Sequence, residues 1–456
     1  MQQLKNSEYT HEAIFSSNQI VPNDNIGIRN SDYLSQYKTP LTLEETELTQ
    51  VMLEDLFAKH LFDKHIASVI DLSNSMKLIS PIIESLIALL KADGRLEVLR
   101  PQNDSTLLRY KLSESGVNHA KSAFQRNGYR GPAPISSSLL SSSIQSQSIK
   151  NKTISKTELT KAFSNIVINE ELLMQLGAAM NSKKAVFIYG DPGTGKTYVS
   201  QKLSRLLGDP VMVPYSVAVG DTIVSIFDPL IHSTVSDELD KGHHDFSKIP
   251  DSRFCLCQRP FVTSGGELAI DDLEIQYDEV SRVYQAPLQL KASNGIYLID
   301  DLGRQRMSPG ELFNRWIVPM ESNEDVLVTQ SGERLSIPFD LVLIFSTNLT
   351  PEKLVDGAFL RRIGHKIEFK SLTYDQFEEI WKLECQKNNL KFDLYHLEYL
   401  FDQLYENTSF PPLACHPRDL VEMAMDFERF NDNHELLSLD SIQKAWDSNF
   451  SFTSMQ

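Results

Sequence analysis

The chain has 456 residues, four cysteines and a formal charge of −17 from 44 basic and 61 acidic side chains. Its 41% hydrophobic and 23% charged residues are typical of globular domains and exclude a fibre, a collagen and a wholly disordered chain. Four cysteines cannot form a disulfide scaffold, and no apolar run approaches the roughly 18 residues that span a bilayer. We therefore expect a cytoplasmic protein without a transmembrane segment, and the excess of acid argues against general affinity for nucleic acids.

The N-terminal third of the chain divides into an arm and a small domain. Residues 1–38 are polar and lack a sustained period, which predicts a flexible arm. Thr42 followed by Glu45 is typical of a capping box that opens a helix. The pattern beyond it predicts two helices, two short strands and a last helix, over about 42–64, 80–93, 96–99, 107–112 and 115–124. Helices followed by a two-stranded hairpin predict an α+β winged-helix domain over 39–130.

A winged helix can bind DNA or another protein, and the sequence favours the protein. The exposed face of the second helix offers Glu84, Ser85, Ala88 and Lys91. Base edges are read mainly by arginine, lysine, asparagine and glutamine, so this face is a poor DNA reader. We therefore interpret the domain as a docking domain, and DNA binding remains the alternative.

The rest of the chain reads as a linker, an α/β domain and a helical domain. Serine occupies eight of the thirteen residues from 136 to 148, which predicts a spacer over 131–156. Between 157 and 371, short apolar strands alternate with helical segments, so we expect a parallel sheet covered on both faces. Beyond it only helical patterns remain, and these predict a separate helical lid over 372–456.

The strongest motif is GDPGTGKT at residues 190–197, which fits the G-x-x-x-x-G-K-[ST] phosphate-binding loop. An apolar strand precedes it and a helix follows, as the motif requires. The loop amides and the helix N-terminus would hold phosphate, and Lys196 would reach the β- and γ-phosphates. We expect the Thr197 hydroxyl to hold Mg²⁺. The predicted nucleotide-binding residues are Gly190, Asp191, Pro192, Gly193, Thr194, Gly195, Lys196, Thr197 and Tyr198.

Two later strands end in polar residues suited to ATP hydrolysis. The run IYLI precedes Asp300 and Asp301, as in a Walker B motif. Asp300 would hold Mg²⁺ through water, and Asp301 would orient the attacking water. The run LVLIF precedes Ser346, Thr347 and Asn348, and the Asn348 amide would position that water between the two Walker motifs. Strand ends at one edge of a parallel sheet are where such sheets place ligands.

Three arginines beyond these strands are candidates for phosphate contacts. Arg361 and Arg362 lie in the segment FLRRIG, and an arginine from one subunit can complete the active site of its neighbour. Arg418 lies in HPRDL at the start of a predicted helix of the lid. We expect Arg418 to contact the γ-phosphate, and Arg361 or Arg362 to act in the adjacent subunit.

The succession GDPGTGKT, LIDD, STN, FLRR and HPRDL resembles the AAA+ ATPases over residues 157–456. By this resemblance Asn348 matches sensor 1, Arg361 and Arg362 match the arginine-finger region, and Arg418 matches sensor 2. Segments such as YRGPAP, FDPLIH and DDLGRQRMSP are similar to a bacterial group described as predicted ATPases with chaperone activity, associated by name with Flp pilus assembly. The resemblance implies a ring, most often of six subunits, that uses ATP and Mg²⁺ to remodel a protein client.

The sequence departs from the AAA+ pattern in two ways, and these departures leave alternative functions open. The second Walker B acid is usually glutamate, and Asp301 is one methylene shorter, which puts the turnover rate in doubt. The interval between the Walker motifs is also long, which predicts an insertion over about 227–287. A slow, nucleotide-gated scaffold is therefore one alternative to a remodelling ATPase, and a DNA-binding loader or regulator is another.

Overall fold

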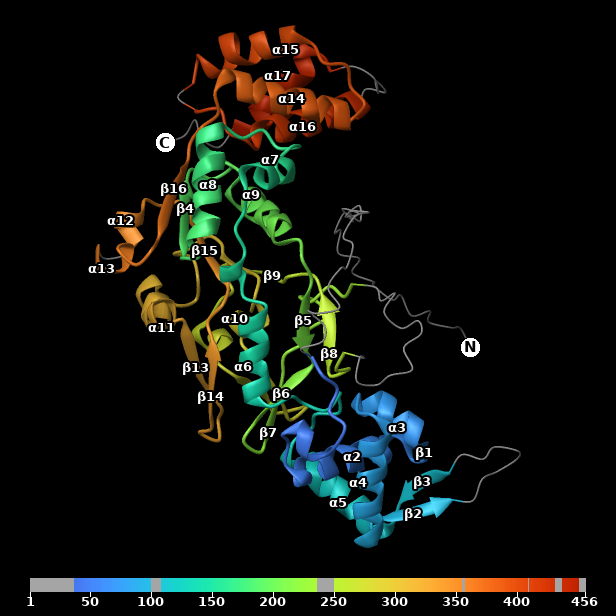
Figure 1. Ribbon diagram of the computed structural model, residues 1–456. Coiled ribbons are helices and arrows are strands. Elements are labelled where there is room, and N and C mark those ends of the chain that lie inside the picture. The colour runs from blue at the N-terminus through green and yellow to red at the C-terminus, as the bar shows by residue number, and fades with distance from the viewer. Residues whose placement is uncertain are drawn as a thin grey trace, which may run out of the picture.

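A computed structural model describes residues 37–99, 108–235, 250–354, 357–408, 410–430 and 437–450. The predicted arm lies outside these residues except for Tyr37 and Lys38. Figure 1 shows three parts along one long axis: an N-terminal α+β unit, an α/β core, and a helical domain at the opposite end. Among the residues that the structure describes, no helix is both long and apolar enough to span a membrane.

The N-terminal unit packs four helices against a three-stranded antiparallel sheet with strand order β1-β3-β2. Its buried residues form one apolar cluster that includes Leu53, Phe57, Ile83 and Leu86. The elements are α2 (Gln50–Lys64), β1 (Ala67–Ser68), α3 (Val69–Met76), α4 (Ser80–Ala92), β2 (Leu96–Leu99), β3 (Arg109–Leu112) and α5 (Glu114–Arg126). The predicted second helix, hairpin and last helix are therefore present.

The first predicted helix is broken near its start. Thr42 does accept a hydrogen bond from the Glu45 amide (3.2 Å), as a capping residue should. The turn it opens is only the short 3₁₀ helix η1 (Glu44–Thr46), because Glu47 adopts a left-handed backbone with φ +57°. Helix α2 then begins at Gln50 with Thr49 as its cap. The single helix predicted from residue 42 was wrong.

The serine-rich segment is not a free spacer. Residues 137–146 form helix α6, whose cap is the Ser136 hydroxyl, and Leu140 and Ile144 are buried in the same cluster as strands of the core. The Gln147 side chain donates to the Met212 carbonyl (3.1 Å), and the Asn294 amide donates to the Ile144 carbonyl (2.9 Å). The linker prediction failed here because hydrogen bonds to distant segments fix the polar residues while two apolar side chains pack.

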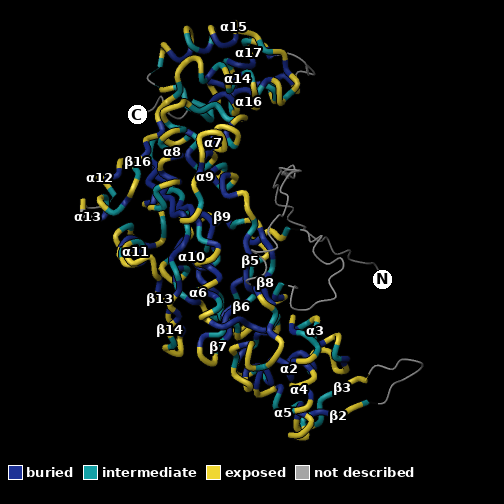
Figure 2. Tube along the Cα trace, viewed as in Figure 1, coloured by how far each residue is buried: buried dark blue, intermediate teal, exposed yellow. Residues whose placement is uncertain are grey.

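The α/β core contains a five-stranded parallel sheet with strand order β16-β4-β15-β12-β9. Alternate residues of β4, β9, β12 and β15 enter two apolar clusters, one on each face, so Val186 and Ile188 face one layer of helices and Phe187 faces the other. The central strands β12 and β15 are buried along their length, whereas the edge strand β16 has exposed residues (Figure 2). The strands are β4 (Val186–Gly190), β9 (Phe261–Ser264), β12 (Ile296–Ile299), β15 (Val342–Thr347) and β16 (His365–Phe369).

Helices cover both faces of this sheet. One layer includes residues of α7 (Lys156–Ala162), α8 (Glu170–Ser182), α9 (Lys196–Leu203) and η3 (Ser204–Leu207). The other includes α11 (Pro309–Ser322), whose Trp316 is fully buried against Tyr297 of β12. With the phosphate-binding loop between β4 and α9, this architecture confirms the predicted α/β P-loop NTPase fold.

Smaller strands form the predicted insertion and extend beyond it. Strand β9 lies inside the interval 227–287 but belongs to the core sheet, so that part of the prediction was wrong. The additional sheets are β10-β11-β7-β6, β5-β8 and β13-β14. Their elements are β5 (Val211–Pro214), β6 (Ser216–Val219), β7 (Thr222–Ser225), β8 (Phe254–Cys257), η5 (Ile270–Leu273), β10 (Gln276–Asp278), β11 (Val283–Gln285), α10 (Leu288–Lys291), β13 (Glu324–Val328) and β14 (Arg334–Pro338).

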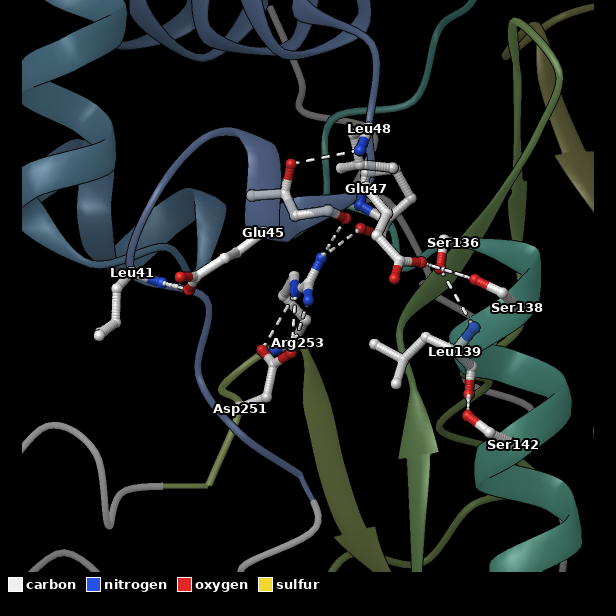
Figure 3. Close-up of polar contacts among 12 residues, drawn as sticks. Leu41, Glu45, Glu47, Leu48, Ser136, Ser138, Leu139, Ser142, Asp251 and Arg253 are labelled. Carbon is white, nitrogen blue, oxygen red and sulfur yellow. Dashed lines mark hydrogen bonds and ion pairs between the residues drawn. The ribbon is translucent and has the colours of Figure 1, made fainter.

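A buried arginine of the core, Arg253, joins the core to the N-terminal unit (Figure 3). Arg253 and Asp251 are each about 1% exposed and meet at 2.7 Å. Arg253 also donates to the carbonyl oxygens of Pro134 (3.1 Å) and Thr46 (3.5 Å). Glu47 accepts hydrogen bonds from the Ser136 and Ser138 hydroxyls of the same region. We call these seven residues the junction; they tie three segments that are far apart in the sequence.

The C-terminal domain is helical and has its own apolar cluster, which includes Phe377, Trp381, Leu420 and Trp446. Its elements are α14 (Tyr374–Lys387), α15 (Leu394–Tyr399), the π-helical turn η6 (Leu400–Tyr405), α16 (His416–Phe430) and α17 (Leu439–Phe450). Short helices α12 (Pro351–Leu354) and α13 (Gly357–Leu360) lie between β15 and β16, and η2 (Ile149–Asn151) follows α6. The predicted separate helical domain is present.

Candidate functional site

The phosphate-binding loop has the backbone that its glycines make possible. Gly190, Gly193 and Gly195 have φ values of +146°, +87° and +88°, which lie in the region that favours glycine. Gly195 is the N-cap of helix α9 and has no side chain with which to cap the first amides of that helix. These amides are free to meet an anion, and the helix dipole favours negative charge there.

Lys196 is a buried cation whose partners are neutral. Its Nζ donates to the carbonyl oxygens of Gly190 (2.9 Å) and Asp191 (2.8 Å) and to Oδ1 of Asn348 (2.8 Å). Burial lowers the pKa of Lys196, and the carboxylates of Asp300, Asp301 and Asp191 oppose that effect. A phosphate would therefore replace neutral acceptors at this ammonium, without a bound carboxylate to displace.

The two Walker B acids have different partners. Thr197 Oγ1 donates to Oδ2 of Asp300 at 2.6 Å, so the two predicted magnesium ligands lie in direct contact. Asp301 accepts a hydrogen bond at Oδ1 from the Asn348 amide (3.1 Å). Asp300 thus faces the phosphate-binding loop, while Asp301 faces the end of strand β15.

Asn348 links the two Walker motifs. Strand β15, which precedes it, lies between β4 and β12 in the sheet, so its end falls between Lys196 and Asp301. The Asn348 side chain accepts from Lys196 and donates to Asp301. The structure therefore brings together Lys196, Thr197, Asp300, Asp301 and Asn348, as expected from the order of the motifs.

These residues line a cavity of about 1170 Å³ between the core and the helical domain. Its apolar wall includes Ile166, Ile168 and Leu372, together with Ile380 of helix α14. Sequence reasoning missed this wall, because the residues before α8 carry no motif and only the fold brings them beside residues more than 200 positions later. Arg304, directly after the Walker B turn, also lines the cavity and was missed.

The helical domain touches the phosphate-binding loop directly. The Cys415 amide donates to the Gly193 carbonyl (3.0 Å), and a Cβ on Gly193 would lie 2.6 Å from Cys415 Sγ. Burial raises the pKa of Cys415 to about 11, so this thiol packs rather than reacts. His416 accepts hydrogen bonds at Nδ1 from Tyr405 and from the Leu413 amide, and burial lowers its pKa to about 4.

The predicted arginines divide into two groups. Arg418 lines the cavity from helix α16, where its guanidinium contacts Asp419 at 2.8 Å and this hydrogen bond raises its pKa. Arg361 and Arg362 do not line the cavity. Arg361 is exposed, and Arg362 pairs with Glu321 of α11 at 2.5 Å. Asp191, Pro192, Thr194 and Tyr198 belong to the loop or the start of α9, and all of them except Asp191 line the cavity.

The donor set fits a magnesium nucleotide. The glycine backbone and free helix amides suit phosphate, and Thr197 with Asp300 offers the oxygen ligands that Mg²⁺ prefers. No separate cluster of three histidine, cysteine or acidic side chains suited to a metal occurs in the described part of the chain. A cation here would therefore be bound together with the phosphates, not by a protein cage.

Comparison with known proteins adds little beyond the fold. A family model described as a domain of unknown function, DUF8689, matches residues 373–448, the helical domain alone. No curated protein matches the chain.

The chain is also similar to three solved structures at 12% identity each. Two are RuvB of Thermotoga maritima. In one of them, a point mutant, the match covers 68% of this chain and 74% of that one with a TM-score of 0.34. In the other, titled a Holliday junction branch migration motor, it covers 66% and 73%, also at 0.34. The match to NtrX from Brucella abortus covers 72% and 60% at 0.38. Scores this low carry no conclusion about this chain.

Proposed function

We propose that the chain is an AAA+ ATPase that binds ATP with Mg²⁺ and hydrolyses it in the cavity between the core and the helical domain. The observation that carries this proposal is the hydrogen-bonded chain from Lys196 through Asn348 to Asp301. Three motifs from separate parts of the sequence meet there in the order that phosphate binding and water activation require. The P-loop fold and the order of the motifs support the AAA+ assignment.

Each residue at the site has a distinct role in the proposed reaction. The loop amides and Lys196 bind the phosphates, and Thr197 and Asp300 hold the magnesium ion, which neutralises phosphate charge. Asp301 accepts a hydrogen bond from the attacking water and takes its proton as the water oxygen bonds to the γ-phosphorus, while the bond from that phosphorus to the bridging oxygen breaks and ADP leaves. Asn348 orients the Asp301 carboxylate and the water. Arg418 lies on the helical domain, so its contact with the γ-phosphate would change with hydrolysis.

The proposed active site needs a second subunit. Arg361 and Arg362 lie outside the cavity of their own chain, on a surface between β15 and β16. An arginine supplied by a neighbour stabilises the charge that spreads over the transferring phosphoryl group. Contacts of this kind join unlike surfaces, so they close into a ring, and six subunits is the expected number.

The proposed client is a protein. Helices α2–α5 with the sheet β1-β3-β2 support the winged-helix assignment, and the net charge of −17 disfavours a polyanion. The junction ties this unit to the core, so a change of angle at the helical domain would be transmitted through a rigid core to the docking unit. Pilus assembly is one setting in which such a protein-remodelling ATPase would act.

Turnover per subunit against protein concentration tests the proposal. We expect the rate per subunit to rise with concentration as rings assemble. Lys196→Ala should lower turnover by about 100-fold or more, because it removes the cation that binds the phosphates. The pair Arg361→Ala and Arg362→Ala should lower turnover similarly while each subunit still binds ATP.

Lys161→Ala is a matched control, since Lys161 is an exposed lysine of helix α7 that does not line the cavity. It should retain most of the turnover. Turnover that is independent of concentration and survives loss of both arginines would contradict the shared site. Tight ATP binding without turnover would instead favour a nucleotide-gated scaffold.

A further inference from the structure

The turn that carries the catalytic acid has an unfavourable backbone. Asp301 has φ +49°, a left-handed conformation that costs a non-glycine residue free energy. Asp301 is also one methylene shorter than the glutamate usual at this position in AAA+ proteins. The backbone therefore determines the direction of the Asp301 carboxylate more strongly than it would determine the direction of a glutamate carboxylate on a longer, more flexible side chain. Whatever holds this turn controls where the acid points.

The Gln305 side chain holds the turn. Its Nε2 donates to the carbonyl oxygens of Asp300 (2.8 Å), Asp301 (3.3 Å) and Gly265 (3.4 Å), and its Oε1 accepts from the Gly303 amide (2.8 Å). One amide thus contacts both Walker B residues and the segment that follows strand β9. Both the donor and the acceptor of the Gln305 side-chain amide are therefore used within this turn.

The turn is also fixed to strand β15. The Leu302 amide donates to the Ser346 carbonyl (2.8 Å), and the Thr347 hydroxyl donates to the Leu302 carbonyl (2.9 Å). These bonds set the position of the turn relative to the strand that carries Asn348. Within the turn, the Asp301 amide donates to Asp300 Oδ1 (3.0 Å) and the Arg304 amide donates to the Asp301 carbonyl (3.0 Å). Gln305 adds a side chain that contacts the carbonyl oxygens of both acids.

We propose that Gln305 is a positioning residue for Asp301. It holds the left-handed turn so that the short carboxylate reaches the Asn348 amide and the attacking water. Gln305 touches neither the phosphates nor the reacting water in this scheme and acts only through Asp301. This inference rests on the proposed ATPase function, since it assigns Gln305 a part in the same hydrolytic step.

Single-turnover hydrolysis and equilibrium ATP binding test the proposal together. Gln305→Ala should lower the hydrolysis rate roughly 10- to 100-fold and leave the Kd for ATP within about 2-fold, because the phosphate-binding loop is not changed. Gln305→Glu has almost the same shape and keeps the acceptor for the Gly303 amide, but it replaces the donor with a carboxylate oxygen. Its hydrolysis rate should therefore fall by a similar factor. Gln276→Ala, at an exposed glutamine whose amide donates to Asp272, is the matched control and should leave the rate unchanged.

Combining the variants separates positioning from folding. In the Asp301→Asn background, adding Gln305→Ala should cause no further loss, because the group through which it acts is already gone. An equal loss in both backgrounds, or a wild-type rate in Gln305→Ala, would overturn the positioning role alone. If the wild-type protein shows no turnover above Lys196→Ala, the proposed function fails, and this inference fails with it.

Discussion

Two buried cations in this molecule have opposite surroundings. Lys196 at the nucleotide site is 7% exposed, and its three close acceptors are neutral oxygens from its own loop and from Asn348. Arg253 at the junction is about 1% exposed and faces the Asp251 carboxylate. Neutral partners leave positive charge available for a phosphate, whereas a carboxylate neutralises it permanently. The comparison separates a cation that serves binding from one that holds two parts of the chain together.

Truncation of the two cations should therefore lower the free energy of unfolding by very different amounts. Arg253→Ala leaves Asp251 buried without its partner and should destabilise the protein by about 3–5 kcal/mol. Lys196→Ala removes a buried charge that has no ion-pair partner to leave behind, so its cost in stability should stay within about 1 kcal/mol. Urea unfolding, followed by the fluorescence of Trp316 in the core and of Trp381 and Trp446 in the helical domain, measures both. Equal losses of stability in the two variants would show that the buried carboxylate does not distinguish Arg253 from Lys196.

Replacing both members of the junction pair sharpens the same comparison. Arg253→Met combined with Asp251→Leu should recover most of the stability lost in Arg253→Ala, because apolar side chains of similar size need no charged partner. A double variant no more stable than Arg253→Ala would show that the carbonyl contacts to Pro134 and Thr46, rather than the ion pair, hold the junction.

The nucleotide site was predictable because its functional residues lie in short contiguous motifs. GDPGTGKT and the acids after β12 each specify their local geometry, and strand order then places them at one edge of the sheet. The apolar wall at Ile166 and Ile168 was not predictable, since no local pattern marks it. It arises only when the segment before α8 meets helix α14 across the cavity.

The contacts of the serine-rich segment were missed for a different physical reason. Serine-rich composition predicts a spacer because few side chains can be buried, yet Tyr37 packs on Phe254 and contacts the hydroxyls of Ser143 and Ser146. A serine hydroxyl pairs with whatever polar group the fold brings near, and that partner lies over 100 residues away. Helix propensity failed at Glu47 likewise, because its left-handed backbone places the carboxylate against Ser136 and Ser138.

The region where the helical domain meets the nucleotide site should lose stability in acid. Nδ1 of His416 already accepts two hydrogen bonds, so protonation would set a new N–H against the Leu413 amide. Its pKa falls from 6.5 to about 4 on folding, so the unfolded chain binds more protons between these values. Stability therefore decreases as pH falls through this window, and His416 should account for about 2 kcal/mol of loss at pH 5.

Thermal unfolding of the wild-type protein and of His416→Gln between pH 7 and pH 5 checks this expectation. The variant should be less stable at pH 7, where it loses packing and hydrogen bonds, but its unfolding temperature should fall less as the pH decreases. Parallel curves for the two proteins would show that the other buried histidines, such as His60 and His232, carry the acid sensitivity instead.

The smallest expected effect lies at the start of the serine-rich helix. The Ser136 hydroxyl accepts from the Leu139 amide (3.1 Å) as a cap and donates to Glu47, so Ser136→Ala should cost about 1 kcal/mol. Ser142→Ala, at an exposed serine of the same helix, should cost less than about 0.5 kcal/mol.

The hydrogen bonds from Ser136 and Ser138 lower the pKa of Glu47, so their stabilising effect is present above the unfolded pKa of 4.5 and is lost as pH falls through the lower folded value. The penalty of Ser136→Ala, measured by urea unfolding, should therefore shrink in strong acid, while that of Ser142→Ala should not change. A penalty independent of pH would assign the role of Ser136 to the cap alone. Glu47 would then have no measurable part in joining the two regions, and Arg253 would be the charged side chain that holds the junction.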